Sequence, residues 1–303
     1  MFPRLSNVVV HKTKGHAVLL FLSSLVCLTI EVTAARTLGT RVPAMQMALV
    51  RSMGAALVFL PLVIQSGGGA YRTSQLSLHL VRGVLSVLGL WCYFMVFASL
   101  PLAEATTLSY SQVFFLTILA SLVLGETVTF VRWFATLIGL IGVALMMRPA
   151  FEGSQAAYFV ALISALLSAL LYTVTKMLTA KDAPQTVMVY VATMTLGAYA
   201  IPGLLAWQHP SGEEAALLLV IASFGPIGQY LGIRAFELAD ASFLAPFDYL
   251  RLVFAGLIGL LLFGEMPDFW AMLGATVIIV GALLISLGTE TSAPIRNVGE
   301  RAS

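Results

Sequence analysis

Four ionisable residues interrupt long apolar runs of the chain: Glu31, Arg51, Asp248 and Arg251. An ionised side chain in an apolar environment is costly unless it faces a partner or a water-filled cavity. Asp248 and Arg251 are three residues apart and would share one face of a helix, where an ion pair can form. Such charges either hold helices together or bind the carboxylate or amine of a solute, and the sequence leaves both interpretations open.

Aromatic and amide side chains lie in the same kind of apolar run. The candidates are Trp91, Tyr110, Gln112, Gln229 and Tyr249. An aromatic ring with a polar edge can stack on a planar ligand and also hydrogen-bond it, although most aromatic residues of membrane bundles serve packing. Together with the four charged residues, these five form the predicted solute-binding set.

Residues that weaken helices fall inside two of the runs. Gly225 and Pro226 lie in the middle of one run, and Pro246 lies near the start of the next. Proline removes a backbone donor and bends a helix. We interpret these three residues as hinges or as backbone that faces a solute.

Two further glycine patterns are interpreted as structural. Gly125-Glu126 and Gly264-Glu265 each follow an apolar run, which predicts a left-handed glycine at the helix end and a glutamate near the N-terminus of the next helix. Small residues in the fifth and tenth runs predict close helix packing, either as scaffold or as a homodimer contact. These residues are Gly139, Gly142, Gly274 and Gly281.

No pattern in the sequence predicts catalytic, metal or cofactor chemistry. The four histidines lie in separate segments, and neither an HExxH, a GxSxG nor a phosphate-binding loop motif occurs. Cys27 and Cys92 lie inside apolar runs without CxxC spacing, so neither a disulfide nor a thiolate metal site is expected. We therefore predict no catalytic residue, no metal and no cofactor.

The composition indicates a membrane protein. Charged residues make up 10% of the 303 residues, hydrophobic residues make up 59%, and the mean hydropathy is +0.97. A soluble domain has about 25% charged residues, so lipid must solvate most of this surface. A net charge of +2 provides no strong field for nucleic acid. The expected partners are the lipid bilayer and a small molecule.

Ten apolar runs are long enough to cross a membrane. A helix needs about 20 residues to span the hydrocarbon core. The runs lie near 16–34, 44–64, 76–98, 103–123, 130–148, 155–178, 185–206, 213–238, 243–263 and 268–287. Their length excludes barrel strands, which predicts an all-α integral membrane protein with ten transmembrane helices. The first run also resembles a signal peptide, but the repeat in the chain requires it as a span.

One stretch of the chain occurs twice. Segments 80–126 and 219–265 align without a gap at an offset of 139 residues (264 − 125), which places Tyr110 on Tyr249. The alignment predicts two five-helix repeats. The expected divisions are an N-terminal tail at 1–15, repeats at 16–148 and 155–287, and a C-terminal tail at 288–303.

Basic residues predict the orientation in the membrane. With a cytoplasmic N-terminus, the inner segments hold Arg4, Lys12, Lys14, Arg72, Arg82, Arg132, Lys176, Lys181, Arg234, Arg296 and Arg301, and the outer segments hold Arg36, Arg41 and Arg148. The positive-inside rule then places both termini in the cytoplasm. Because five is odd, the second repeat would enter from the opposite side, related to the first by a pseudo-two-fold axis in the membrane plane. Secondary transporters typically have this inverted architecture.

Three segments resemble the EamA-type branch of the drug/metabolite transporter superfamily. They are LPLAEATTLSY at 100–110 before a run ending in LGE, IGLIGVALMMRP at 138–149, and ADASFLAPFDYLRLVFAGLIGLLLFGE at 239–265. The resemblance covers about 16–287. It implies a multi-pass carrier of the bacterial inner membrane that moves a small organic solute by alternating access. Members similar to this branch include importers of riboflavin and S-adenosylmethionine and exporters of amino acids, metallophores and drugs.

Other functions were weighed against this interpretation. A membrane scaffold or partner protein without transport could have the same fold. An enzyme would need a nucleophile or metal set, and a channel would need filter loops or charge rings, and neither pattern occurs. We expect a polar, partly planar solute such as a flavin, a nucleoside-like cofactor or an amino-acid derivative. The direction of transport, coupling to a proton or counter-solute, and a homodimer stay open.

Overall fold

The computed structural model describes residues 4–38, 41–99, 107–147, 155–263, 266 and 268–288. Every regular element in these ranges is a helix, and no strand occurs in them. The first half contains α1 (Arg4–Leu38), α2 (Ala44–Gln65), η1 (Gly69–Tyr71), α3 (Leu76–Ser99), α5 (Ser111–Leu122) and α6 (Phe130–Met147). The second half contains α7 (Gln155–Thr179), α8 (Pro184–Leu205), α9 (Gly212–Leu238), α10 (Ala241–Leu244), η2 (Ala245–Tyr249), α11 (Leu250–Phe263) and α12 (Phe269–Gly288).

The all-helical class is confirmed. Within the described residues, six helical segments are long and apolar enough to cross a membrane, and four further apolar helices are shorter. The six are Lys14–Ala35, α2, α7, α8, α9 and Ala241–Ile258, and the shorter ones are Leu76–Gly89, Thr107–Leu122, Phe130–Leu145 and Phe269–Leu284. Helix α1 begins at Arg4, ahead of the predicted first span. The predicted C-terminal tail lies outside the described residues.

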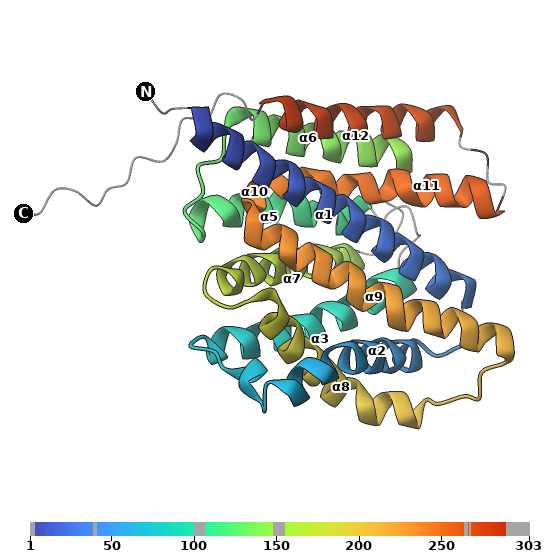
Figure 1. The fold of residues 1–303 in the computed structure, drawn as a ribbon. Coiled ribbons are helices and arrows are strands. Elements are labelled where there is room, and N and C mark those ends of the chain that lie inside the picture. Colours follow the sequence, from blue (N-terminus) through green and yellow to red (C-terminus); the bar gives the residue numbers. More distant parts are fainter. Residues whose placement is uncertain are drawn as a thin grey trace, which may run out of the picture.

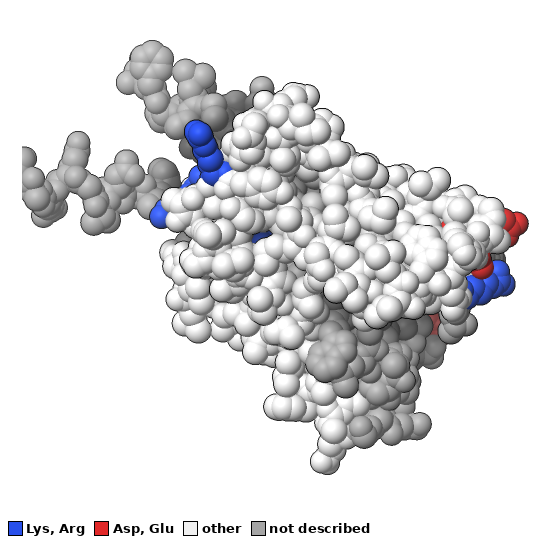
Figure 2. All heavy atoms as spheres, turned by 90° about the horizontal axis from the view of Figure 1, so that it is seen from below, with Lys and Arg blue, Asp and Glu red and all other residues white. Residues whose placement is uncertain are grey.

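The outer surface is apolar, as lipid contact requires. Large side chains such as Leu57, Phe159, Ile201 and Leu261 are 64%, 66%, 70% and 79% exposed. Figure 2 shows that the charged side chains gather at two ends of the molecule, while the face between them is almost entirely uncharged. In a helical bundle with this surface, the backbone hydrogen bonds are formed within the helices, and apolar side chains face the lipid chains.

Four helix pairs build the bundle, and each pair joins one helix from each half. Helix α1 packs along α9, α3 along α7, α2 along α8, and α6 along α12. In Figure 1, α6, α11 and α12 lie on one side of the bundle, α2, α3 and α8 lie on the other, and α1 and α9 cross between them. The core is therefore shared between the two halves of the chain.

Small residues allow the pair α6 and α12 to approach closely. A Cβ on Gly142 would lie 2.7 Å from Ile278, and one on Gly281 would lie 3.5 Å from the Ala135 carbonyl oxygen. Since later residues of one helix meet earlier residues of the other, the two helices are antiparallel. These glycines therefore serve the scaffold within one chain, and a homodimer stays a prediction.

The predicted ninth span is not one regular helix. Its described residues form the short α10, the 3₁₀ helix η2 that contains Pro246, and then α11. Pro246 is fully inside the fold, as are Phe247 and Tyr249. Helix α9, in contrast, runs unbroken past its internal Pro226. The break at η2 turns the polar side chains of residues 248–251 toward the neighbouring helices.

Candidate functional site

The first polar cluster joins α1, α2 and α9. The Arg51 Nε donates to Glu31 Oε1 at 2.5 Å, and its Nη1 donates to Gln229 Oε1 at 3.3 Å. The Glu31 and Arg51 side chains are 13% and 27% exposed. The sequence analysis named all three residues as candidates but did not establish contacts between them. The structure brings them together as one charge-assisted network inside the apolar bundle.

Two helix-weakening residues of α9 lie directly beside this cluster. A Cβ on Gly225 would lie 2.7 Å from Glu31 Oε1, so only glycine lets α9 approach the carboxylate. Pro226 lacks an amide hydrogen, which leaves the Ala222 carbonyl without its helical donor. Gly54 of α2 lies against that carbonyl, where a Cβ would be 2.1 Å from the oxygen. The predicted hinge thus supports the Glu31–Arg51 pair and the close contact of α2 with α9.

The second polar cluster joins the α5 region to η2 and α11. The Gln112 side-chain amide donates to Asp248 Oδ2 at 2.7 Å. The Arg251 Nε donates to the Tyr110 hydroxyl at 3.4 Å, and the guanidinium carbon lies 5.7 Å from the centre of the Tyr110 ring. Each contact joins a residue of the first half to a residue of the second. Four predicted site residues therefore meet at the boundary between the halves.

The predicted local ion pair between Asp248 and Arg251 does not form. Within the described residues, Asp248 accepts from an amide and Arg251 donates to a phenol, and no ion pair joins the two. Asp248 belongs to η2 and Arg251 to α11, and each side chain has a partner from the other half of the chain instead. Both charged side chains contact neutral partners. A charged ligand can displace a neutral partner at a lower free-energy cost than that of breaking an ion pair.

Tyr249 has a structural position. Its side chain is 1% exposed, its hydroxyl donates to the Thr136 carbonyl of α6 at 3.1 Å, and its ring rests on Gly139. The ring lies 5.8 Å from that of Tyr110. Tyr249 thus anchors η2 to α6 and supports Tyr110, which contacts the charged group.

A small cavity lies beside the second cluster. It has a volume of about 10 Å³, and its lining includes Gln112, Tyr172, Phe236 and Asp248. This volume suits about one water molecule, whereas organic ligands occupy pockets of several hundred Å³. The conformation is therefore closed around these side chains, and an organic solute requires the helices to separate.

Sequence reasoning missed two residues near this cavity, the partly buried Tyr172 and the buried Arg82. Tyr172 of α7 lines it, and Arg82 of α3 is 3% exposed with its Nε bonded to Thr175 Oγ1 at 2.9 Å. Arg82 had been counted only among the basic residues that orient the chain. Its place seven residues into a membrane-crossing apolar run was the signal that could have identified it. The Trp91 side chain lies outside the described residues.

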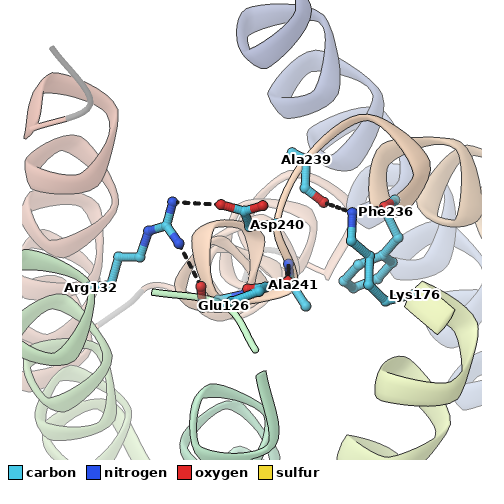
Figure 3. A network of polar contacts seen from close by, with 8 residues as sticks. Glu126, Arg132, Lys176, Phe236, Ala239, Asp240 and Ala241 are labelled. Atoms are coloured by element: carbon cyan, nitrogen blue, oxygen red, sulfur yellow. Dashed lines mark hydrogen bonds and ion pairs between the residues drawn. The ribbon is translucent and has the colours of Figure 1, made fainter. Parts of the chain in front are cut away.

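A charged network closes one end of the bundle. Figure 3 shows Arg132 of α6 pointing toward Asp240, and Lys176 of α7 pointing toward the last carbonyls of α9. The Arg132–Asp240 distance is 3.0 Å, and Lys176 Nζ donates to the Phe236 and Ala239 carbonyls at 2.7 Å. The Glu126 carboxylate accepts the amide hydrogens of residues 241 and 242 at 2.8 and 2.9 Å.

This network corrects the interpretation of Glu126. The sequence suggested that Glu126 caps the next helix, α6, but the structure shows it capping α10 in the other half. The left-handed Gly125, with φ of 67°, is as predicted. It redirects the chain after α5 so that the carboxylate reaches the N-terminus of α10, where it interacts with the helix dipole. Gly264 and Glu265 lie outside the described residues.

Within the described residues, no group of three or more metal-ligating side chains occurs. The two clusters present carboxylate, guanidinium, amide and phenol groups in an apolar bundle. That donor and acceptor set can bind and orient a polar organic molecule.

Comparisons with known proteins agree with polar clusters in an apolar helical bundle that can bind a polar organic molecule. The EamA-like transporter family matches the chain twice, over residues 15–148 and 155–287. An S-adenosylmethionine uptake transporter of Rickettsia prowazekii (strain Madrid E) is 31% identical over 283 residues, covering 93% of this chain and 96% of the relative. A riboflavin transporter of Vibrio cholerae serotype O1 is 32% identical over 261 residues, covering 84% and 87%.

Two further similarities bear on function and fold. A pseudopaline exporter of Pseudomonas aeruginosa (strain UCBPP-PA14) is 30% identical over 251 residues, covering 80% of this chain and 86% of the relative. A solved crystal structure shares the fold, with a TM-score of 0.76 and 18% identity, and covers 89% of this chain and 96% of its own.

Proposed function

The chain belongs to the EamA-like transporter family of metabolite transporters, and we propose that it is a secondary carrier of the bacterial inner membrane. It moves a small polar organic metabolite by alternating access. Ten transmembrane helices form two inverted repeats, at 16–148 and 155–287, and the solute binds between them. Both tails, 1–15 and 288–303, are cytoplasmic.

The helix bounds support the repeat. Helices α5 and α11 begin 139 residues apart (250 − 111), and so do α6 and α12 (269 − 130). The same offset relates α2 to α8 and α3 to α9 to within a few residues. An equal spacing of helix starts over this length is the expected trace of a duplicated unit.

The direction of equivalent helices supports the inversion. Helices α6 and α12 are equivalent under the offset and pack antiparallel, as the contacts of Gly142 and Gly281 require. Helices α2 and α8 are also equivalent, and the start of α2 meets the end of α8, where Gln46 bonds to Gln208 at 2.8 Å. A pseudo-two-fold axis in the membrane plane produces this relation.

One observation carries the proposal: the polar side chains of 248–251 are held by Tyr110 and Gln112 of the other half. These contacts lie in an apolar bundle where charge is costly. Separation of the halves would free a carboxylate, a guanidinium, an amide and a phenol together. A polar solute can replace the contacts between the halves and then be released on the other side as they re-form.

The relatives narrow the range of solutes. They include an S-adenosylmethionine uptake transporter and a riboflavin transporter, and both molecules combine a planar ring system with hydrogen-bonding groups. Glu31, Arg51, Trp91, Tyr110, Gln112, Gln229, Asp248, Tyr249 and Arg251 form the site. Gly225, Pro226 and Pro246 are the points at which α9 and the η2 segment bend.

Uptake into proteoliposomes tests the function. Purified protein is reconstituted and given labelled S-adenosylmethionine or riboflavin, with an imposed pH gradient or with unlabelled solute inside. Saturable uptake of at least one solute supports the carrier, and the two arms distinguish proton coupling from exchange. Uptake no faster than in protein-free vesicles for a broad metabolite panel would exclude it.

A further inference from the structure

Arg82 is a buried cation with an unused donor. Its side chain is 3% exposed, and its Nε donates to Thr175 Oγ1 at 2.9 Å. The Nη1 atom is buried and has no hydrogen-bond partner. A buried donor without an acceptor is destabilising, and native structures rarely keep one without a functional reason.

No carboxylate of the described residues forms an ion pair with Arg82. Two other arginines of the interior have anions nearby. Arg51 pairs with Glu31 at 2.5 Å, and Arg251 interacts electrostatically with Asp248. Within the described residues, the Arg82 guanidinium is therefore left without an anion as a direct partner.

Arg82 lies next to the wall of the small cavity. Its partner Thr175 is one helical turn from Tyr172 on α7, and Tyr172 lines the cavity together with Asp248. The charged groups of Arg82, Asp248 and Arg251 all lie close enough to Tyr172 to interact with it electrostatically. A guanidinium with an unused donor and a carboxylate that accepts from an amide therefore both lie near Tyr172.

We propose that Arg82 binds a carboxylate of the transported solute and that Asp248 receives its amino group, so that the solute carries an amino-acid moiety. The proposal rests on the carrier function above and narrows its substrate class. A planar guanidinium matches a carboxylate with two parallel hydrogen bonds. Riboflavin has no carboxylate and would leave Arg82 unpaired, whereas S-adenosylmethionine has both groups.

A binding assay with matched probes tests Arg82 directly. The probes are S-adenosylmethionine, its decarboxylated form, and the protein amino acids with their corresponding amines. Full-length protein in detergent is compared as wild type, Arg82→Gln and Arg82→Lys. Arg234→Gln is the control, because Arg234 forms a part-exposed pair with Glu237 at 2.6 Å.

The expected result is a carboxylate preference that depends on Arg82. Wild type and the control bind at least one carboxylate probe about 10- to 100-fold more tightly than its decarboxylated partner, as a charge-assisted contact implies. Arg82→Gln reduces this ratio to about one, and Arg82→Lys keeps part of it. Removal of the unpaired charge leaves the thermal unfolding temperature of Arg82→Gln unchanged or higher.

Two results would overturn the proposal. One is a wild-type protein without a carboxylate preference for any probe pair, and the other is an Arg82→Gln protein that retains the preference. A lower unfolding temperature with an unchanged ratio would assign Arg82 a structural role only. If Arg82→Gln leaves riboflavin uptake intact, the carboxylate site is refuted and the carrier function is supported. If the protein prefers carboxylate probes but transports none of them, the binding site is supported and the carrier function is refuted.

Discussion

The ring centroids of Tyr110 and Tyr249 lie 5.8 Å apart, although the residues are 139 positions apart in the chain. They align at the offset of 139 residues, and under the proposed inverted repeat such residues can touch only close to the axis that relates the two copies. Their environments nevertheless differ. The Tyr110 hydroxyl accepts from Arg251, whereas the Tyr249 hydroxyl donates to a backbone carbonyl of α6.

Phenylalanine substitutions should separate the roles of the two tyrosines. Tyr110→Phe removes the acceptor of Arg251, so we expect solute affinity to fall by about 3- to 10-fold with little loss of stability. Tyr249→Phe removes a buried hydrogen bond and should lower the free energy of unfolding by about 1 kcal/mol with little effect on affinity. Equilibrium binding and denaturant unfolding measure both. Equal effects on affinity would contradict the assignment.

A double-mutant cycle should show whether Glu31 and Arg51 act as a pair. Arg51→Gln leaves a partly buried carboxylate without its cation and should lower the free energy of unfolding by about 1–3 kcal/mol, between the values for buried and exposed pairs. Glu31→Gln combined with Arg51→Gln should recover most of this loss. If the double variant is stable but does not transport solute, the pair belongs to the site. Full transport by it would identify a structural contact.

Close packing at Gly139 should be intolerant of even one methyl group. A Cβ there would lie 2.2 Å from the Tyr249 ring, so Gly139→Ala should lower the free energy of unfolding by about 1–3 kcal/mol. Gly197 of α8 is a matched control with nothing within 4 Å of its Cβ position. Gly197→Ala should be neutral or slightly stabilising, because alanine favours helices. Similar losses for both variants would refute the packing argument.

Glu126 should control opening at the end of the bundle that Figure 3 shows. Glu126→Gln weakens the cap on α10, and a loss of about 1.4 kcal/mol would raise the open population about tenfold. The measurement is thiol labelling of Ala245→Cys, a buried position, in a protein without Cys27 and Cys92. Glu213→Gln, at the exposed start of α9, is the control. Labelling that is no faster than with Glu126 intact would contradict the closure role.

Much of the fold could be predicted from the sequence because lipid imposes simple rules. Apolar runs must be helices, and the ungapped repeat carries over to helix starts that are 139 residues apart. The irregular η2 segment could not be predicted, because its side chains are held by Gln112 and by the Thr136 carbonyl from the other half. Local sequence cannot encode contacts that only tertiary packing creates.

The sequence predicted which residues form the candidate site but not which of them contact one another. Charges in apolar runs pointed to Glu31, Arg51, Asp248 and Arg251, and the structure places them in two clusters. The possible ion pair between Asp248 and Arg251 does not form, because Gln112 and Tyr110 of the other half contact these side chains. Arg82 was missed because a basic residue near a helix end also fits the positive-inside rule, although its place within the apolar run 76–98 was a signal, and its burial confirms an interior position.

The central claim is that residues 248–251 meet the solute between the two halves. Uptake into proteoliposomes by wild type, Asp248→Asn, Arg251→Ala and the control Arg234→Gln tests it most directly. We expect saturable uptake by wild type and the control, and at least a tenfold lower rate for both site variants when equal amounts of folded protein are reconstituted. Unchanged uptake by Asp248→Asn and Arg251→Ala would contradict the account.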